Sequence, residues 1–129
     1  MKKKYLIIIA NYYEDIANGL LDSALKLIPK SNFIKIIKVP GVFEIPVTIS
    51  KNIKKYDAFL ALGCVIKGQT PHFDFISQAS TNAIMDLSIH NNKPIGNGII
   101  TCLNMNQAKL RRKKGAEAAN AVNSVLSQK

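Results

Sequence analysis

The chain has 129 residues and a formal net charge of +10, from 18 lysines and arginines against 8 aspartates and glutamates. Hydrophobic residues make up 47% of it and its mean hydropathy is +0.06, which excludes a disordered tail and a membrane bundle. The longest apolar run, Tyr5–Ala10, is too short to span a bilayer and lacks the cleavage site of a signal peptide. We therefore expect one domain over residues 1–129, a cytoplasmic location and no membrane partner.

The elements are predicted from the alternation of apolar runs with helical periodicity. In chain order we predict a strand at Tyr5–Ala10, a helix from Ile16 to Ile28, a strand at Phe33–Val39, a helix from Pro46 to about Lys55 and a strand at Asp57–Val65. A helical stripe from Phe73 to Leu87, a strand at Ile95–Cys102 and a helical segment from Met105 to the end, broken at Gly115, complete the chain. Strands that alternate with helices indicate an α/β fold, with a parallel four-stranded sheet covered on both faces.

The ends of these strands are where a ligand is expected, because parallel sheets bind ligands beyond the carboxyl ends of their strands. After the third strand, Thr70 is the predicted N-cap and Pro71 the first helical residue, and backbone N–H groups at such a helix start form an anion site. The stretch resembles a P-loop, but Gln69 replaces the required lysine, so we reject nucleoside triphosphate binding. His72 is either a proton-transfer group near neutral pH or simply a solvated residue of the helix start.

The first two strand ends allow two interpretations each. Phe43 is apolar in a turn and Ile45 is a poor N-cap before Pro46, and departures of this kind often mark function. Glu44 can accept hydrogen bonds from a polyol or an amine, or it can only complement the helix N-terminus. Tyr12 can stack on a flat ring or can pack against the protein.

Cysteines, histidines and the basic charge carry no strong functional signal. Cys64 and Cys102 have no metal-ligand spacing, and His72 and His90 have no Cys or His three or four residues away, so we expect reduced, buried thiols and no metal. The chain contains 16 lysines, 18 isoleucines and 12 asparagines, all with AT-rich codons, so mutational bias competes with an anionic ligand as the source of the charge. The basic run Lys109–Lys114 has no RNA-binding motif beside it, and we expect no nucleic-acid partner.

Several ordered stretches carry a family resemblance, which extends from Tyr5 to Leu126. They are residues 39–46 (VPGVFEIP), 56–58 (YDA), 62–74 (LGCVIKGQTPHFD), 98–101 (GIIT), Asn104, 107–108 (QA) and 115–119 (GAEAA). In order and spacing they resemble the 6,7-dimethyl-8-ribityllumazine synthase family of riboflavin biosynthesis.

The resemblance implies a three-layer, flavodoxin-like α/β/α sandwich and a transferase that needs no cofactor. The family condenses 5-amino-6-(D-ribitylamino)uracil with 3,4-dihydroxy-2-butanone 4-phosphate, releasing phosphate and water. The resemblance also implies small-molecule substrates, a homopentamer or a multiple of it with active sites between subunits, and riboflavin synthase as a candidate partner. A lumazine- or flavin-binding module without turnover is the alternative.

The resemblance also implies a set of site residues. His72 matches the proton-transfer histidine. The substrate-binding positions are Tyr12, Val42, Phe43, Glu44, Val65, Ile66 and Asn97. The phosphate-binding positions are Gly68, Gln69, Thr70 and Arg111, the last supplied by a neighbouring subunit, and Lys114 matches a later lysine near the site.

Three departures from the family pattern bear on assembly. Asn97 stands where the family has an aromatic residue that crosses the subunit interface. The stretch between Arg111 and Gly115 is shorter than usual, and the chain starts without the leading segment that adds a strand to a neighbour in many members. We therefore expect a free pentamer rather than a shell.

Overall fold

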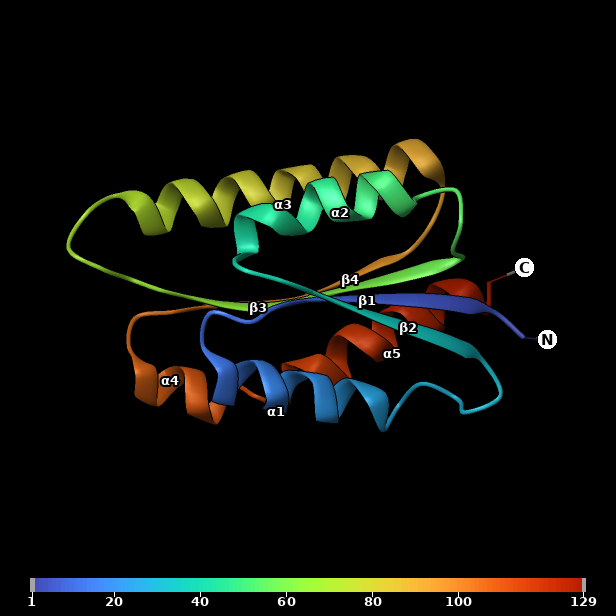
Figure 1. Cartoon of the computed structure of the whole chain (residues 1–129), viewed down its shortest axis with the longest axis horizontal. Helices are drawn as coiled ribbons and strands as arrows, with labels where there is room; N and C mark the ends of the chain where they lie inside the picture. Colours follow the sequence, from blue (N-terminus) through green and yellow to red (C-terminus); the bar gives the residue numbers. More distant parts are fainter. Residues whose placement is uncertain (1, 129) are drawn as a thin grey trace.

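A parallel sheet forms the centre of the molecule (Figure 1). The computed structural model describes residues 2–128. Its strands are β1 (Lys4–Ala10), β2 (Phe33–Val39), β3 (Ala58–Ile66) and β4 (Ile95–Cys102), and they lie in the order β2-β1-β3-β4. All three pairings are parallel, which confirms the predicted sheet. The order is that of the first four strands of a flavodoxin-like sheet, with its switch point between β1 and β3.

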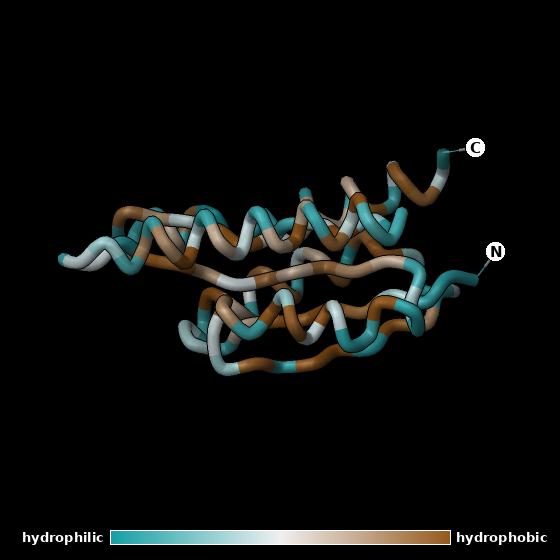
Figure 2. The backbone as a smooth tube through the Cα atoms, turned by 90° about the horizontal axis from the view of Figure 1, so that it is seen from above, coloured by the Kyte–Doolittle hydropathy of each residue, from teal (hydrophilic) through white to brown (hydrophobic). Residues whose placement is uncertain are grey.

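Helices cover both faces of this sheet (Figure 1). They are α1 (Glu14–Leu25), α2 (Ile45–Asn52), α3 (His72–Asn91), α4 (Met105–Leu110) and α5 (Lys114–Leu126), and a 3-10 turn at Val42–Glu44 precedes α2. One face packs against α2 and α3, and the other against α1, α4 and α5. In Figure 2 the helices alternate between hydrophilic and hydrophobic segments, whereas the strands form longer hydrophobic stretches.

The inner strands β1 and β3 supply most of the core because apolar side chains project from both of their faces. Ile7 and Ile9 of β1 are buried against α1 and α5, while Leu6 and Ile8 are buried against α2 and α3. Continuous apolar runs of this kind are typical of strands covered on both faces. No helix among residues 2–128 is both long enough and apolar enough to cross a membrane.

Several predicted element ends are wrong by a few residues. The first helix begins at Glu14 and ends at Leu25, before Pro29, because the chain turns there to bury Ile28. The break in the last helical segment lies at residues 111–113, and Gly115 belongs to the first turn of α5. The strands at Phe33–Val39 and Ile95–Cys102 are confirmed at both ends.

The predicted helix starts also need correction. Pro71, not Thr70, occupies the N-cap position of α3, and the Thr70 hydroxyl accepts a long, 3.4 Å hydrogen bond from the backbone N–H of His72. Glu44 is the N-cap residue of α2, so that Ile45 is already helical and fully buried. The apolar residue that makes a poor cap is therefore part of the core.

Candidate active site

A cavity of about 530 Å³ opens at the carboxyl edge of the sheet, where β1, β2 and β3 end. This edge lies at the left of Figure 1, on the side of the β3–α3 loop and away from the chain termini. The lining residues are Tyr12, Tyr13, Val42, Phe43, Cys64, Val65, Ile66, His72 and Ile76. Three separate strand ends and the first turns of α3 thus converge on one largely apolar space beside the topological switch point, where such sheets bind ligands.

Six residues predicted from the sequence meet in this cavity. They are Tyr12, Val42, Phe43, Val65, Ile66 and His72. Glu44 does not line this cavity but lines an apolar groove between α2 and α3 that shares Phe43 with the cavity. The structure therefore brings together the expected contacts to a flat ring and the expected proton-transfer histidine.

The end of β1 presents two tyrosines that lie against each other. Asn11 extends the sheet by donating its backbone N–H to the Val39 carbonyl (2.9 Å), and the chain then turns into α1. The rings of Tyr12 and Tyr13 meet edge to face, with centroids 4.9 Å apart and planes at 82°. Tyr12 is 75% exposed. Its ring is therefore not packed into the core, and one face is available to a ligand.

The 3-10 turn after β2 explains why an apolar residue stands in a loop. Val42 is buried beneath the turn and Phe43, the next residue, is 65% exposed at the cavity mouth. The turn is held by the Thr48 hydroxyl, which donates to the Glu44 carbonyl at 2.8 Å, and by the Glu44 N–H, which donates to Gly41 at 3.2 Å. A rigid backbone thus holds Phe43 at the cavity mouth.

The loop from β3 to α3 has the properties of an anion site. Lys67 donates its N–H to the Cys102 carbonyl (2.8 Å), which ties the start of the loop to β4. Gly68, Gln69 and Thr70 follow, and all three are exposed. Within residues 2–128 their backbone N–H groups donate to no protein acceptor. Free N–H groups in a loop that leads into the N-terminus of a 20-residue helix favour a bound anion.

The remaining predicted residues lie outside the cavity, on the β4 side of the molecule. Asn97 is exposed in the middle of β4 and accepts a hydrogen bond from the Ile99 N–H (3.1 Å). Arg111, at the C-cap of α4, donates to the Thr101 carbonyl at 3.4 Å. Lys114 pairs with Glu117 at 3.2 Å. None of these three residues lines the cavity of its own chain.

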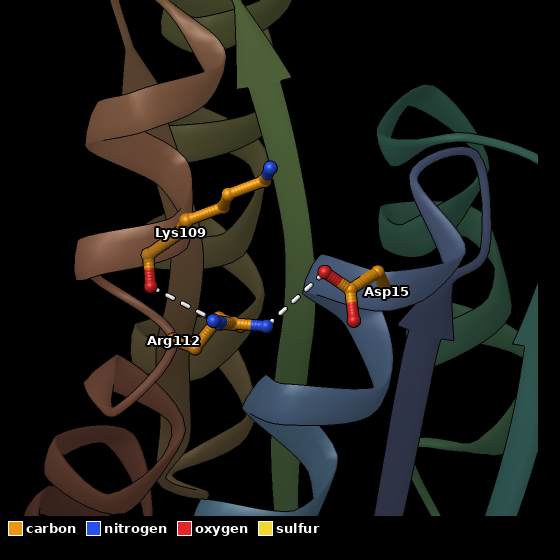
Figure 3. A network of polar contacts seen from close by, with 3 residues as sticks. All are labelled: Asp15, Lys109 and Arg112. Carbon is orange, nitrogen blue, oxygen red and sulfur yellow. Dashed lines mark hydrogen bonds and ion pairs between the residues drawn. The ribbon is translucent and has the colours of Figure 1, made fainter.

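A polar network ties this β4 side to α1 (Figure 3). Arg112 donates to the Asp15 carboxylate at 3.1 Å and, through Nε, to the Lys109 carbonyl at 3.1 Å. This pairing was not predictable from local patterns, because Asp15 and Arg112 are 97 positions apart.

The cavity also contains three residues that the sequence did not single out as ligand contacts, Tyr13, Cys64 and Ile76. Tyr13 directly follows Tyr12, a predicted substrate contact, so its place in the sequence was a signal that it also lines the site. Burial, together with the adjacent Tyr12 and Cys64, raises the pKa of the Tyr13 phenol above its ordinary value. Ile76 lies one turn beyond His72 on the helical stripe that was assigned to the core.

The two cysteines are free and buried, as predicted. Burial, and secondarily the Cys102 thiol, raises the pKa of Cys64 to about 12. Among residues 2–128 no group of three His, Cys, Asp or Glu side chains is placed to hold a metal ion.

The parallel sheet with helices on both faces defines the chain as a flavodoxin-like α/β protein, and its cavity lies beside the switch point, where proteins of this class bind small molecules. The family model for 6,7-dimethyl-8-ribityllumazine synthase matches residues 2–129. The chain belongs to this family.

Relatives named 6,7-dimethyl-8-ribityllumazine synthase resemble the chain along most or all of its length. The protein of Bartonella tribocorum is 41% identical over 140 residues, covering 100% of this chain and 93% of its own. The protein of Agrobacterium fabrum is 39% identical over 143 residues, covering 100% and 97%. The protein of Renibacterium salmoninarum is 42% identical over 105 residues, covering 80% of this chain and 66% of its own.

The high pKa of Cys64 predicts a thiol that resists alkylation. At pH 8 the folded protein should be labelled at Cys64 by iodoacetamide far more slowly than the unfolded chain, because the thiolate is the nucleophile. A raised pKa also means that the unfolded chain loses its proton first, so this thiol lowers folding stability as the pH rises above about 9, the ordinary value. Mass spectrometry of labelled peptides measures the rate of alkylation, with denatured protein as the control. Equal rates in the folded and the unfolded protein would contradict the burial of Cys64.

Proposed function

We propose that this chain catalyses the condensation of 5-amino-6-(D-ribitylamino)uracil with 3,4-dihydroxy-2-butanone 4-phosphate to 6,7-dimethyl-8-ribityllumazine. The observation that carries the proposal is the meeting of six predicted substrate and catalytic residues in one cavity of a chain that belongs to this family. An imine forms between the amine and the ketone with loss of one water, phosphate leaves by elimination, and the second amine closes the ring with loss of another water.

The pyrimidine ring is proposed to lie between the exposed face of Tyr12 and the β3 end. Val65 and Ile66 are half-buried there and supply an apolar surface of the kind that a flat ring covers. Phe43 and Glu44, on the turn after β2, stand where the ribityl chain would leave the ring. The Glu44 carboxylate has no ion-pair partner among residues 2–128, so it remains available to the hydroxyls of that chain.

The phosphate of the second substrate is proposed to bind the free N–H groups of Gly68, Gln69 and Thr70. This position lies directly before His72, whose side chain is exposed and lines the cavity. Imine formation and phosphate elimination both need proton transfer, which an imidazole in this position can carry out. The rest of the acceleration comes from holding two substrates together, where effective molarities contribute about 7–11 kcal/mol.

The enzyme is proposed to be a homopentamer, or a multiple of it, in which each cavity is completed by a neighbouring copy. Supporting this, Arg111, Lys114 and Asn97 lie on the β4 side and do not line the cavity of their own chain. An apolar groove between α2 and α3, lined in part by Phe43 and Val47, is open to solvent in the single chain. A neighbour seated there would cover apolar surface and bring its own cation to the phosphate loop.

Further properties are proposed on the same basis. Residues 2–128 share one sheet with a core on each face, which supports a single domain over residues 1–129. The enzyme is proposed to work in the cytoplasm with no cofactor or metal and to pass its product to riboflavin synthase.

Replacing His72 tests the catalytic assignment. His72→Ala should lower kcat by about 100-fold, since general acid–base groups contribute roughly 10²–10⁴. Lumazine fluorescence measures the product, and His90→Ala, at the other end of α3, is the matched control that should retain activity. Tight lumazine binding without any turnover by the native chain would instead favour a binding module, and an unchanged kcat in His72→Ala would remove the histidine from the mechanism.

Replacing Tyr13 tests whether it orients the stacking ring. Tyr13→Leu removes the edge-to-face contact with Tyr12, and such contacts contribute about 0.5–1.5 kcal/mol. We expect the KM for the pyrimidine to rise about three- to tenfold while the KM for the phosphate-bearing substrate stays constant. Tyr13→Phe keeps the ring and should behave as the native enzyme does; equal losses in both variants would assign the effect to the hydroxyl.

A further inference from the structure

The turn between α4 and α5 is short and closely packed. It consists of residues 111–113, and both helices continue directly from it. The Arg111 N–H donates to Ala108 (3.1 Å), and the Arg111 carbonyl accepts from the Lys114 N–H (3.0 Å). The position of Arg111 therefore depends on the contacts that hold the rest of this turn in place.

Ser23 of α1 holds the far side of the turn. Its hydroxyl accepts a hydrogen bond from the Ala116 N–H (3.1 Å) and lies within donating distance of the Arg112 and Leu20 carbonyls, at 3.1 and 3.0 Å. Gly115 packs so closely on α1 that a Cβ at this position would collide with the Leu20 carbonyl oxygen. One half-buried hydroxyl thus bridges the turn, α5 and α1.

Arg112 holds the same turn from the outside (Figure 3). Its aliphatic stem lies on Gly19, where an added Cβ would come within 2.5 Å of Arg112 Cδ. Its guanidinium bonds the Asp15 carboxylate and the Lys109 carbonyl, each at 3.1 Å. The side chain therefore joins the first turn of α1, the middle of α1 and the last turn of α4.

The near end of α4 is fixed independently of these contacts. Asn104 caps the helix by accepting from the Gln107 N–H (2.9 Å), and the Gln107 side chain accepts from the Leu103 N–H (2.8 Å). With its start capped and its end held on α1, α4 has one defined position. Arg111 is then presented beside the β4 end, where Nη1 donates to the Thr101 carbonyl.

We propose that Arg112, together with Ser23, is a positioning residue that holds the short α4–α5 turn against α1 and so places Arg111 for the phosphate of a neighbouring active site. This rests on the proposed function, in which Arg111 binds that phosphate. Arg112 itself touches no substrate.

The contacts predict which part of Arg112 matters. The Asp15–Arg112 pair is exposed on both sides, at 73% and 39%, and exposed ion pairs contribute little. The stem on Gly19 and the bond to the Lys109 carbonyl are the larger contributions. Loss of the whole side chain should therefore have a greater effect than loss of the carboxylate partner.

Steady-state kinetics test the proposal. Arg112→Ala should raise the KM for the phosphate-bearing substrate about three- to tenfold and leave the KM for the pyrimidine unchanged. Arg112→Lys keeps the stem and charge but loses the Nε bond to the Lys109 carbonyl, so its KM for the phosphate-bearing substrate should lie between those of the native enzyme and Arg112→Ala. Asp15→Asn should remain within about twofold of the native enzyme. Asp22→Asn, on the same helix, is the control, and Ser23→Ala gives a second route to the same loss if Arg112→Ala does not fold. A proportional rise in both KM values, or no rise in either, would overturn the proposal.

Binding of inorganic phosphate, measured by calorimetry, separates this proposal from the proposed reaction. If the native chain has no turnover but binds phosphate, the reaction fails, and weaker phosphate binding by Arg112→Ala still supports the positioning role. If the native chain is active and Arg111→Ala weakens phosphate binding while Arg112→Ala and Ser23→Ala do not, the positioning role fails and the reaction stands. If phosphate does not bind the native chain at all, the positioning role also fails.

Discussion

The parallel pairing of β1 with β3 is the constraint on which the rest of the structure depends. Because these inner strands are buried on both faces and run in the same direction, the loops that follow them leave the sheet at the same edge. From β1 the chain continues to β2 on one side of this pair, and from β3 it continues to β4 on the other side. The loops that follow β1 and β3 therefore diverge, which leaves a space between them. Tyr12 follows β1 and Val65 lies at the end of β3, so this pairing brings both residues to the lining of one cavity.

The sheet was predictable because its strands are continuous apolar runs separated by helical periodicity. The errors lie where tertiary contacts decide the local structure. Ile45 was interpreted as a poor cap, but it is helical because its side chain enters the core. Gly115 was interpreted as a helix break, but its missing side chain permits α5 to pack on α1. In both cases the conformation of the residue is decided by a contact with a residue distant in the sequence, which local sequence patterns do not contain.

The candidate site was predictable where its residues come from strand ends of one chain. Tyr12, Phe43 and His72 meet in the cavity because the topology brings their loops together. Asn97 and Arg111 do not line this cavity, and the Arg111 side chain donates instead to the Thr101 carbonyl. Tyr13 and Cys64 were missed although each directly adjoins a predicted contact in the sequence, because side-chain packing decides which of the neighbouring residues also line the cavity. The resemblance, not the spacing, pointed to a contribution from a second subunit.

Only a small part of the net positive charge has a role in the proposed function. Lysines occur on exposed positions throughout the chain, whereas the two arginines are adjacent and occupy the α4–α5 turn. Arginine is suited to bidentate recognition of phosphate and to fixed hydrogen-bond geometry. One arginine is proposed to bind substrate phosphate and the other, through its stem and its hydrogen bond to the Lys109 carbonyl, to hold the first in place.

Complementation between two inactive variants tests most directly whether the active site is shared between subunits. His72→Ala and Arg111→Ala are each expressed alone and then together, and the solution mass shows whether mixed assemblies have formed. If one subunit supplies the histidine and its neighbour the arginine, about one quarter of the sites in a random equal mixture contain both native residues. The mixed assembly should then recover about that fraction of native turnover, well above either variant alone. Mixed assemblies of confirmed mass with no more activity than their parents would contradict a shared site.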